Sequence, residues 1–122
     1  MFTLSRFKPG HTQTNGTASL LCSAQQLSQQ LAALHFNPTY IAGFVSPHVN
    51  LDEVARQVSQ RFPNATISLC TTAGELSSEG QRLYCATGAQ WDRVVLQLFD
   101  ASIIAAAEIV RVPLECEDIR SG

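Results

Sequence analysis

Apolar residues recur at helical spacing in the first third of the chain, at Leu20, Ala24, Leu27, Leu31 and Leu34. This spacing predicts a long amphipathic helix that Thr17 caps and that ends at Asn37-Pro38, because proline disfavours a helical residue before it. The opposite face carries hydroxyl and amide groups, on Ser23, Gln25, Gln26, Gln29 and Gln30. An uncharged face repels a second copy only weakly, so we expect self-association; an ordinary solvated face is the alternative.

The residues before this predicted helix carry turn signals in place of a periodic pattern. Lys8-Pro9-Gly10 and Asn15-Gly16 both favour turns. We therefore expect residues 1–16 to form an irregular N-terminal arm. The length of 122 residues suits one further domain, which we assign to residues 17–122.

A strand, a helix and a second strand follow this region. The continuous apolar run from Tyr40 to Val45 is typical of a strand covered on both faces. Asn50 caps the next helix, with Glu53 at the capping-box spacing. The inward stripe of that helix consists of Leu51, Val54, Ala55, Val58 and Phe62. The run from Thr66 to Cys70 is the second strand, so the order predicts a βαβ unit with two parallel strands in the middle of a sheet.

Two further runs rich in branched residues end the pattern. Arg93 to Phe99 reads as a strand, Asp100 to Ser102 as a turn, and Ile103 to Val112 as another strand, although its alanines also permit a helical turn. Two such strands joined by a short turn predict an antiparallel hairpin. The fold class is therefore α/β: a mixed sheet with a βαβ unit, helices packed on the sheet and a C-terminal antiparallel hairpin.

Charge and hydropathy exclude several classes of partner. The formal net charge is -2 and the eight lysines and arginines are scattered, so no basic surface is available for nucleic acid. No apolar run approaches the roughly 20 residues that cross a bilayer, and the first residues lack the features of a signal peptide. We expect a cytoplasmic protein with neither a nucleic-acid nor a membrane partner.

The four cysteines, Cys22, Cys70, Cys85 and Cys116, are widely spread. They form no CxxC pair and no group with histidine at zinc spacing, so a metal site is not supported. Free cysteine packs like a small apolar residue, and we expect these thiols to be reduced and buried.

The candidate ligand site follows from the predicted parallel strands, because ligands of open α/β sheets bind outside the carboxyl ends of the strands. The loops there are Ser46-Pro47-His48 and Thr71 to Glu75. The helix that starts after Asn50 points its free N–H groups toward an anion, Gly74 allows close approach, and Glu75 suits an ammonium group. The predicted ligand-binding residues are Ser46, His48, Cys70, Thr71, Thr72, Gly74 and Glu75.

Two other interpretations of the second loop stay open. Its threonines and glycine also suit a tight turn with no ligand. Alternatively, Cys70 acts as the nucleophile of a thiol-dependent hydrolase with His48 as its base, which requires the two side chains to lie within hydrogen-bond reach. No protease signature surrounds Cys70, so we expect the chain not to be an enzyme.

Two blocks of sequence resemble the N-terminal domain of the FIST family. They are YIAGFVSP at residues 40–47 and SLCTTAGE at residues 68–75, with a helix of about a dozen residues between them. The strand that runs into CTTAGE is the more specific block. With the preceding predicted helix the resemblance covers roughly residues 17–80. Family members usually carry a C-terminal FIST domain as well, which we expect this chain to lack.

The resemblance implies a sensory domain of a signalling protein. It implies a small ligand, possible ligands including amino acids, and a signalling partner such as a histidine kinase or a cyclic-dinucleotide enzyme. Some relatives bind haem and sense nitric oxide, which makes a haem-based sensor an alternative. Haem needs an iron ligand, and His48 is the histidine placed at the predicted site.

Overall fold

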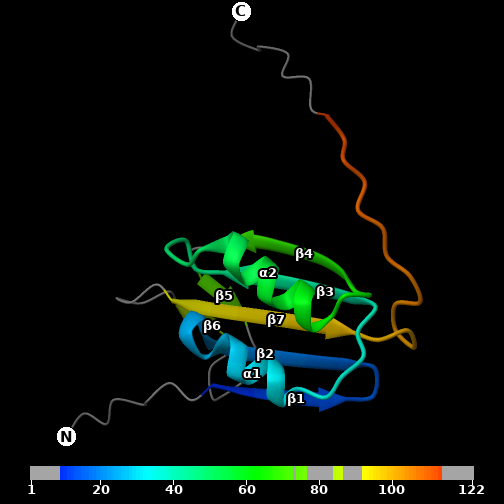
Figure 1. The fold of residues 1–122 in the computed structure, drawn as a ribbon, viewed down its shortest axis with the longest axis horizontal. Helices are drawn as coiled ribbons and strands as arrows, with labels where there is room; N and C mark the ends of the chain where they lie inside the picture. The colour runs from blue at the N-terminus through cyan, green and yellow to red at the C-terminus, as the bar shows by residue number, and fades with distance from the viewer. Residues whose placement is uncertain (1–8, 73, 77–83, 87–91, 114–122) are drawn as a thin grey trace, which may run out of the picture.

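The computed structural model describes residues 9–72, 74–76, 84–86 and 92–113, which form a sheet with both α-helices on one face (Figure 1). The strands are β1 (Gly10–Thr14), β2 (Thr17–Ser23), β3 (Tyr40–Val45), β4 (Thr66–Thr71), β5 (Gly74–Leu76), β6 (Tyr84–Ala86) and β7 (Arg93–Phe99). The helices are α1 (Leu27–Ala33), which follows the 3₁₀ turn Ala24–Gln26, and α2 (Leu51–Arg61). Within these described residues no helix has the length and apolar character needed to span a bilayer.

The main sheet has the strand order β1-β2-β7-β3-β4, and β5 pairs with β6 in a small separate ladder behind it (Figure 1). Strands β3 and β4 are parallel, with Tyr40 beside Thr66 and Val45 beside Thr71. Strand β7 is antiparallel to both of its neighbours, β2 and β3. The expected α/β class, with a βαβ unit and helices packed on a mixed sheet, is confirmed.

Strand β2 occupies residues where the sequence analysis places the start of a long helix. That prediction is wrong for Thr17–Ser23, because a four-residue spacing of apolar side chains is also a multiple of the two-residue strand period. Asn15-Gly16 forms the turn between β1 and β2, with Gly16 at φ +88°. The expected irregular arm thus contains strand β1, and the α-helix spans only Leu27–Ala33.

The predicted C-terminal hairpin is also wrong. Strand β7 has β2 along one edge and β3 along the other, so neither edge is open to a strand formed by Ile103–Val112. Residues 100–103 form a turn, and residues 104–113 form no strand. The run Ile103–Val112 contains branched apolar residues that favour a strand, but the chain leaves the sheet after β7.

Strand β4 lies at an edge of the sheet, not in the middle as predicted. Its residues alternate: Ile67 and Leu69 pack against the core, whereas Ser68 and Cys70 are exposed on the face away from the helices. This alternation is typical of a strand with one covered face, so the run from Thr66 to Cys70 is less continuously apolar than the prediction assumed.

The core lies between the sheet and the two helices. Val94, Leu96 and Leu98 of strand β7 form the centre of this core and are all fully buried. Gly43 of β3 faces the same layer. A Cβ atom built on Gly43 overlaps Leu69 Cδ2 and lies 2.8 Å from Leu96 Cδ2, so the neighbouring leucines fill the space above this residue.

Helix α2 begins as the sequence predicts, because the side chain of Asn50 accepts a hydrogen bond of 3.1 Å from the backbone N–H of Glu53. We expect Asn50→Ala to lower the free energy of unfolding by about 1 kcal/mol, since it removes this cap. Urea denaturation measures the loss. Asn37→Ala, at an exposed asparagine outside any helix or strand, is the control. Equal losses in both variants contradict a capping role.

Candidate functional site

The carboxyl ends of β2, β3 and β4 meet the first residue of β7 at one end of the sheet. The antiparallel register places Ser23 beside Arg93 and Val45 beside Val94, and the parallel register places Val45 beside Thr71. We name this region the polar edge. It consists of Ser23, Ser46, Thr71, Thr72, Asp92 and Arg93.

Ser46 joins the end of β3 to the start of β7. It is fully buried, its Oγ accepts a hydrogen bond of 3.1 Å from the backbone N–H of Arg93, and its own N–H donates to the Arg93 carbonyl at 2.9 Å. A buried hydroxyl with this partner holds the backbone of Arg93 in place. Ser46 lies at the end of β3, as the sequence predicts, and its hydroxyl contacts β7; its predicted role in binding a ligand stays a prediction.

Asp92 and Arg93 place charges of both signs at the polar edge. Arg93 Nη1 lies 3.0 Å from Asp92 Oδ1, and each side chain is 20% exposed. The carbonyl of Asp92 accepts a 2.8 Å hydrogen bond from Ala24 N–H, which ties this pair to the chain that leaves β2. A guanidinium binds a carboxylate through paired N–H groups, and a carboxylate accepts from an ammonium group.

Cys22 lies beside Val94 in the β2–β7 register, one residue before Ser23, and is fully buried in the core. Burial raises the pKa of its thiol from 9.0 to about 12; the charge of Arg93 acts in the opposite direction and that of Asp92 in the same direction. The thiol is therefore protonated at neutral pH. A protonated, buried thiol is neither a nucleophile nor a metal ligand, so Cys22 serves packing.

The remaining residues of the first predicted loop and of the end of β4 lie around the same edge. Thr72 N–H donates to the Val45 carbonyl at 2.9 Å, which extends the β3–β4 ladder by one residue. Thr71 and His48 are exposed, His48 in the turn between Ser46 and α2. The structure thus brings Ser46, Thr71 and Thr72 together.

Cys70 differs from its prediction. It lies beside Phe44 in the β3–β4 register, on the face away from the helices, and it is exposed. The expected burial is confirmed for Cys22 and is wrong for Cys70, because the alternation along β4 turns Cys70 out of the core. Cys116 and the side chain of Cys85 lie outside the described part of the chain.

Gly74 and Glu75 belong to β5, where they pair with Ala86 and Cys85 of β6. The loop predicted around them is thus partly a strand. The prediction that Gly74 makes room for a ligand and that Glu75 receives its charge concerns side-chain surroundings outside the described part of the chain.

The start of α2 is a poorer anion site than the sequence analysis assumes. The side chain of Asn50 already accepts from Glu53 N–H, and the first turn carries the acidic residues Asp52 and Glu53. The negative charges of Asp52 and Glu53 repel an anion at this end of the helix. Among the described polar-edge residues, Arg93 is the cation, and its guanidinium lies 3.0 Å from Asp92 Oδ1.

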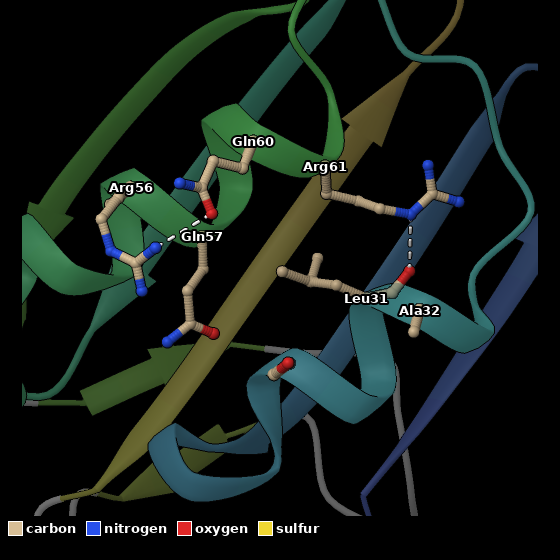
Figure 2. Close-up of a pocket in the computed structure, with 7 residues that line it drawn as sticks. Leu31, Ala32, Arg56, Gln57, Gln60 and Arg61 are labelled. Carbon is tan, nitrogen blue, oxygen red and sulfur yellow. Dashed lines mark hydrogen bonds between the residues drawn. The ribbon is translucent and has the colours of Figure 1, made fainter.

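A groove of about 490 Å³ lies between α1 and α2 on the outer side of the helix layer (Figure 2). It is lined by Ser28, Leu31, Ala32, Arg56, Gln57, Gln60 and Arg61. Arg61 at the end of α2 reaches α1, where its Nε donates to the Leu31 carbonyl at 3.0 Å and its Nη2 to the Leu34 carbonyl at 2.7 Å. These bonds satisfy carbonyls at the end of α1 and hold the two helices together.

The second arginine of the groove is engaged within α2. Arg56 binds both carboxylate oxygens of Glu53 and donates to Gln60 Oε1 at 2.9 Å. The hydrogen bond from Arg56 lowers the pKa of Glu53 to about 2, with a smaller contribution in the same direction from Gln57. Gln57 Oε1 is buried and has no hydrogen-bond partner within the described residues. The groove therefore offers a neutral acceptor, while both of its cations already have partners.

Sequence reasoning missed Asp92, Arg93 and Ser23 as residues of the edge. Their place depends on β7 running between β2 and β3, and the sequence analysis paired β7 with Ile103–Val112 instead. A local signal was present, since adjacent opposite charges directly precede the apolar run Val94–Phe99.

A family model described as the FIST N domain matches residues 39–119 of this chain. The match begins one residue before β3 and includes the polar-edge residues of β4 and β7. Neither the curated proteins nor the solved structures contain a significant match to the chain.

Proposed function

This chain belongs to the FIST family of sensory-type domains, and we propose that it binds a small ligand with a carboxylate and an ammonium group, such as an amino acid, at the polar edge. The observation that carries this proposal is the Asp92–Arg93 pair at the carboxyl ends of the strands. An amino acid offers the complementary charges: its carboxylate to the Arg93 guanidinium and its ammonium group to the Asp92 carboxylate.

The partial burial of the pair supports recognition of such a ligand. Side chains that are 20% exposed are less screened by water and salt than fully exposed charges. Ser46 supports the pair indirectly, because its hydroxyl accepts a hydrogen bond from the backbone N–H of Arg93. The groove between α1 and α2 is less suited to an amino acid, because none of its described lining residues carries a carboxylate to bind the ammonium group.

The same proposal includes a place in signalling. By its resemblance to the family, the domain passes the ligand-bound state to a signalling partner such as a histidine kinase or a cyclic-dinucleotide enzyme. Cys22 and Cys70 are free thiols, which suits a reducing compartment such as the cytoplasm.

We expect a thermal-shift screen with the common amino acids to identify at least one that raises the unfolding temperature, since a ligand of the native state stabilises it. For that amino acid, Arg93→Gln is expected to weaken binding roughly 10- to 100-fold, the effect of losing one charge-assisted hydrogen bond of about 1.5–3 kcal/mol. Isothermal titration calorimetry measures the change.

The Glu53–Arg56 pair provides a matched control, because it is an ion pair on the exposed side of α2. Arg56→Gln is expected to leave the affinity unchanged. Unchanged affinity in a folded Arg93→Gln variant contradicts a site at the polar edge. The same screen includes haemin, and a Soret band from the purified complex points to the haem-based sensor instead.

A further inference from the structure

The outer edge of β4 has the backbone groups that a further strand needs. Thr66 N–H and Thr72 N–H donate inward to the Thr39 and Val45 carbonyls beside β3. Backbone groups of successive strand residues point to opposite sides, so Ile67, Leu69 and Thr71 direct their N–H and C=O groups away from β3. Within the described residues, no strand pairs with this side of β4.

The side chains of β4 also have incomplete cover at this edge. Ile67 and Leu69 pack against the core but are only half-buried, whereas Ile41 and Val45 on the neighbouring β3 are fully buried. A further apolar strand beside β4 increases the burial of Ile67 and Leu69, which is favourable.

The chain itself leads to this edge after β7. Thr39 Oγ1 donates to the Ile104 carbonyl, and Thr66 Oγ1 donates to the Ala107 carbonyl at 2.8 Å. Residues 104–107 therefore pass the first residues of β3 and then of β4. Beyond them, residues 108–113 extend away from the sheet (Figure 1).

Residues 108–113 carry apolar side chains that are largely exposed. Ile109 is 58% exposed, and Val110 and Val112 are each 71% exposed. Branched apolar residues favour strands, and their exposure in an extended segment is unfavourable. Within the described residues, neither the segment nor the outer edge of β4 pairs with another strand, and the bond from Thr66 Oγ1 to the Ala107 carbonyl holds the start of the segment beside the start of β4.

We infer that residues 108–112, which extend away from the sheet in the arrangement described above, also adopt a second arrangement in which they add to the outer edge of β4 of the same chain as a sixth strand, parallel to β4. Continuing the contact between Thr66 and Ala107 places residue 110 beside Leu69 and residue 112 beside Thr71. Neighbours in register share a face of the sheet, so Glu108 lies at the start of the face under α2, beside Ile67, and Val110 and Val112 continue that face with apolar side chains. Ile109 and Arg111 then lie beside Ser68 and Cys70 on the opposite face.

A disulfide between Cys70 and a cysteine introduced at residue 111 tests the proposed register. Cys70 is exposed, and neighbouring strands bring paired Cα atoms within the range of roughly 4.4–6.8 Å that a disulfide requires. In the full chain with Cys85→Ser and Cys116→Ser, Arg111→Cys is expected to form an intramolecular disulfide with Cys70 under mild oxidation. Peptide mass spectrometry identifies the bond, and a non-reducing gel shows whether the product is a monomer.

Val110→Cys is the matched control, because the proposed register turns residue 110 to the other face. It is expected to form the disulfide at least about tenfold more slowly than Arg111→Cys. Equal rates, or no bond in either variant, overturn the proposed strand. A bond that links two copies also overturns it and shows strand exchange between molecules.

Hydrogen exchange gives an independent measurement without new cysteines. The double substitution Val110→Asp and Val112→Asp is expected to lower the protection of the Leu69 and Thr71 amides at least about tenfold, with the Ile41 amide unchanged. Unchanged protection at both positions contradicts docking of the segment on β4.

Discussion

Gly43→Val is expected to lower the free energy of unfolding by about 3 kcal/mol, the upper part of the usual range for overfilling a packed core. Gly43 lies on the helix-facing side of β3, where a Cβ atom overlaps Leu69 Cδ2 and lies 2.8 Å from Leu96 Cδ2. Both leucines must move to admit a branched side chain, and Leu96 is fully buried in the central strand β7.

Gly10→Val is the matched control for this substitution. Gly10 also lies in a strand, but among the described residues other than its two chain neighbours no atom lies within 4 Å of a Cβ built there. Both variants gain the same preference of valine for strands, so their difference isolates the packing cost. Urea denaturation of both variants measures it, and similar stabilities contradict a tightly filled core at Gly43.

Raising the pH through the range of the Cys22 thiol is expected to destabilise the fold. Burial raises the pKa of this thiol from 9.0 to about 12 in the folded state. Between these values the unfolded chain releases a proton that the folded chain keeps, so stability is complete below about pH 9 and falls as the pH rises toward 12. The full difference corresponds to about 4 kcal/mol.

The measurement is the free energy of unfolding at a series of pH values from 8 to about 11, in which each unit above about pH 9 costs about 1.4 kcal/mol through this thiol. Cys22→Ala is expected to remove that component of the slope. Cys70→Ala, which alters an exposed thiol, is expected to retain it. If Cys22→Ala and the parent chain lose stability with the same slope, the thiol of Cys22 is not protected by the fold.

The elements that the sequence predicts well are those with local signals. Asn50 with Glu53 marks the start of α2, and the βαβ order predicts that β3 and β4 are parallel. The start of β2 was misread because a four-residue spacing suits a strand and a helix alike. In that case the Asn15-Gly16 turn was the better guide.

The errors that matter most for function come from long-range pairing. The sequence of residues 93–99 carries no signal that this strand pairs between β2 and β3, because its pairing depends on residues more than 40 positions away in the chain. The sequence therefore predicts that Ser46, Thr71 and Thr72 lie at one end of β3 and β4, as the structure has them, but it does not bring Asp92 and Arg93 to that end; whether these residues bind a ligand stays a prediction. The roles of Gly74, Glu75 and His48 toward a ligand remain predictions.

The position of β7 determines when the domain is able to fold. Strands β2 and β3 are synthesised before β7. Their edges that pair with β7 therefore stay unpaired until residue 99 has left the exit tunnel of the ribosome. Pairings between such distant segments raise the contact order and slow folding relative to a sheet of consecutive hairpins. Nascent chains that end before Phe99 expose the inner edges of β2 and β3. Exposed strand edges pair readily with other chains, so we expect these nascent chains to be prone to aggregation and to bind chaperones.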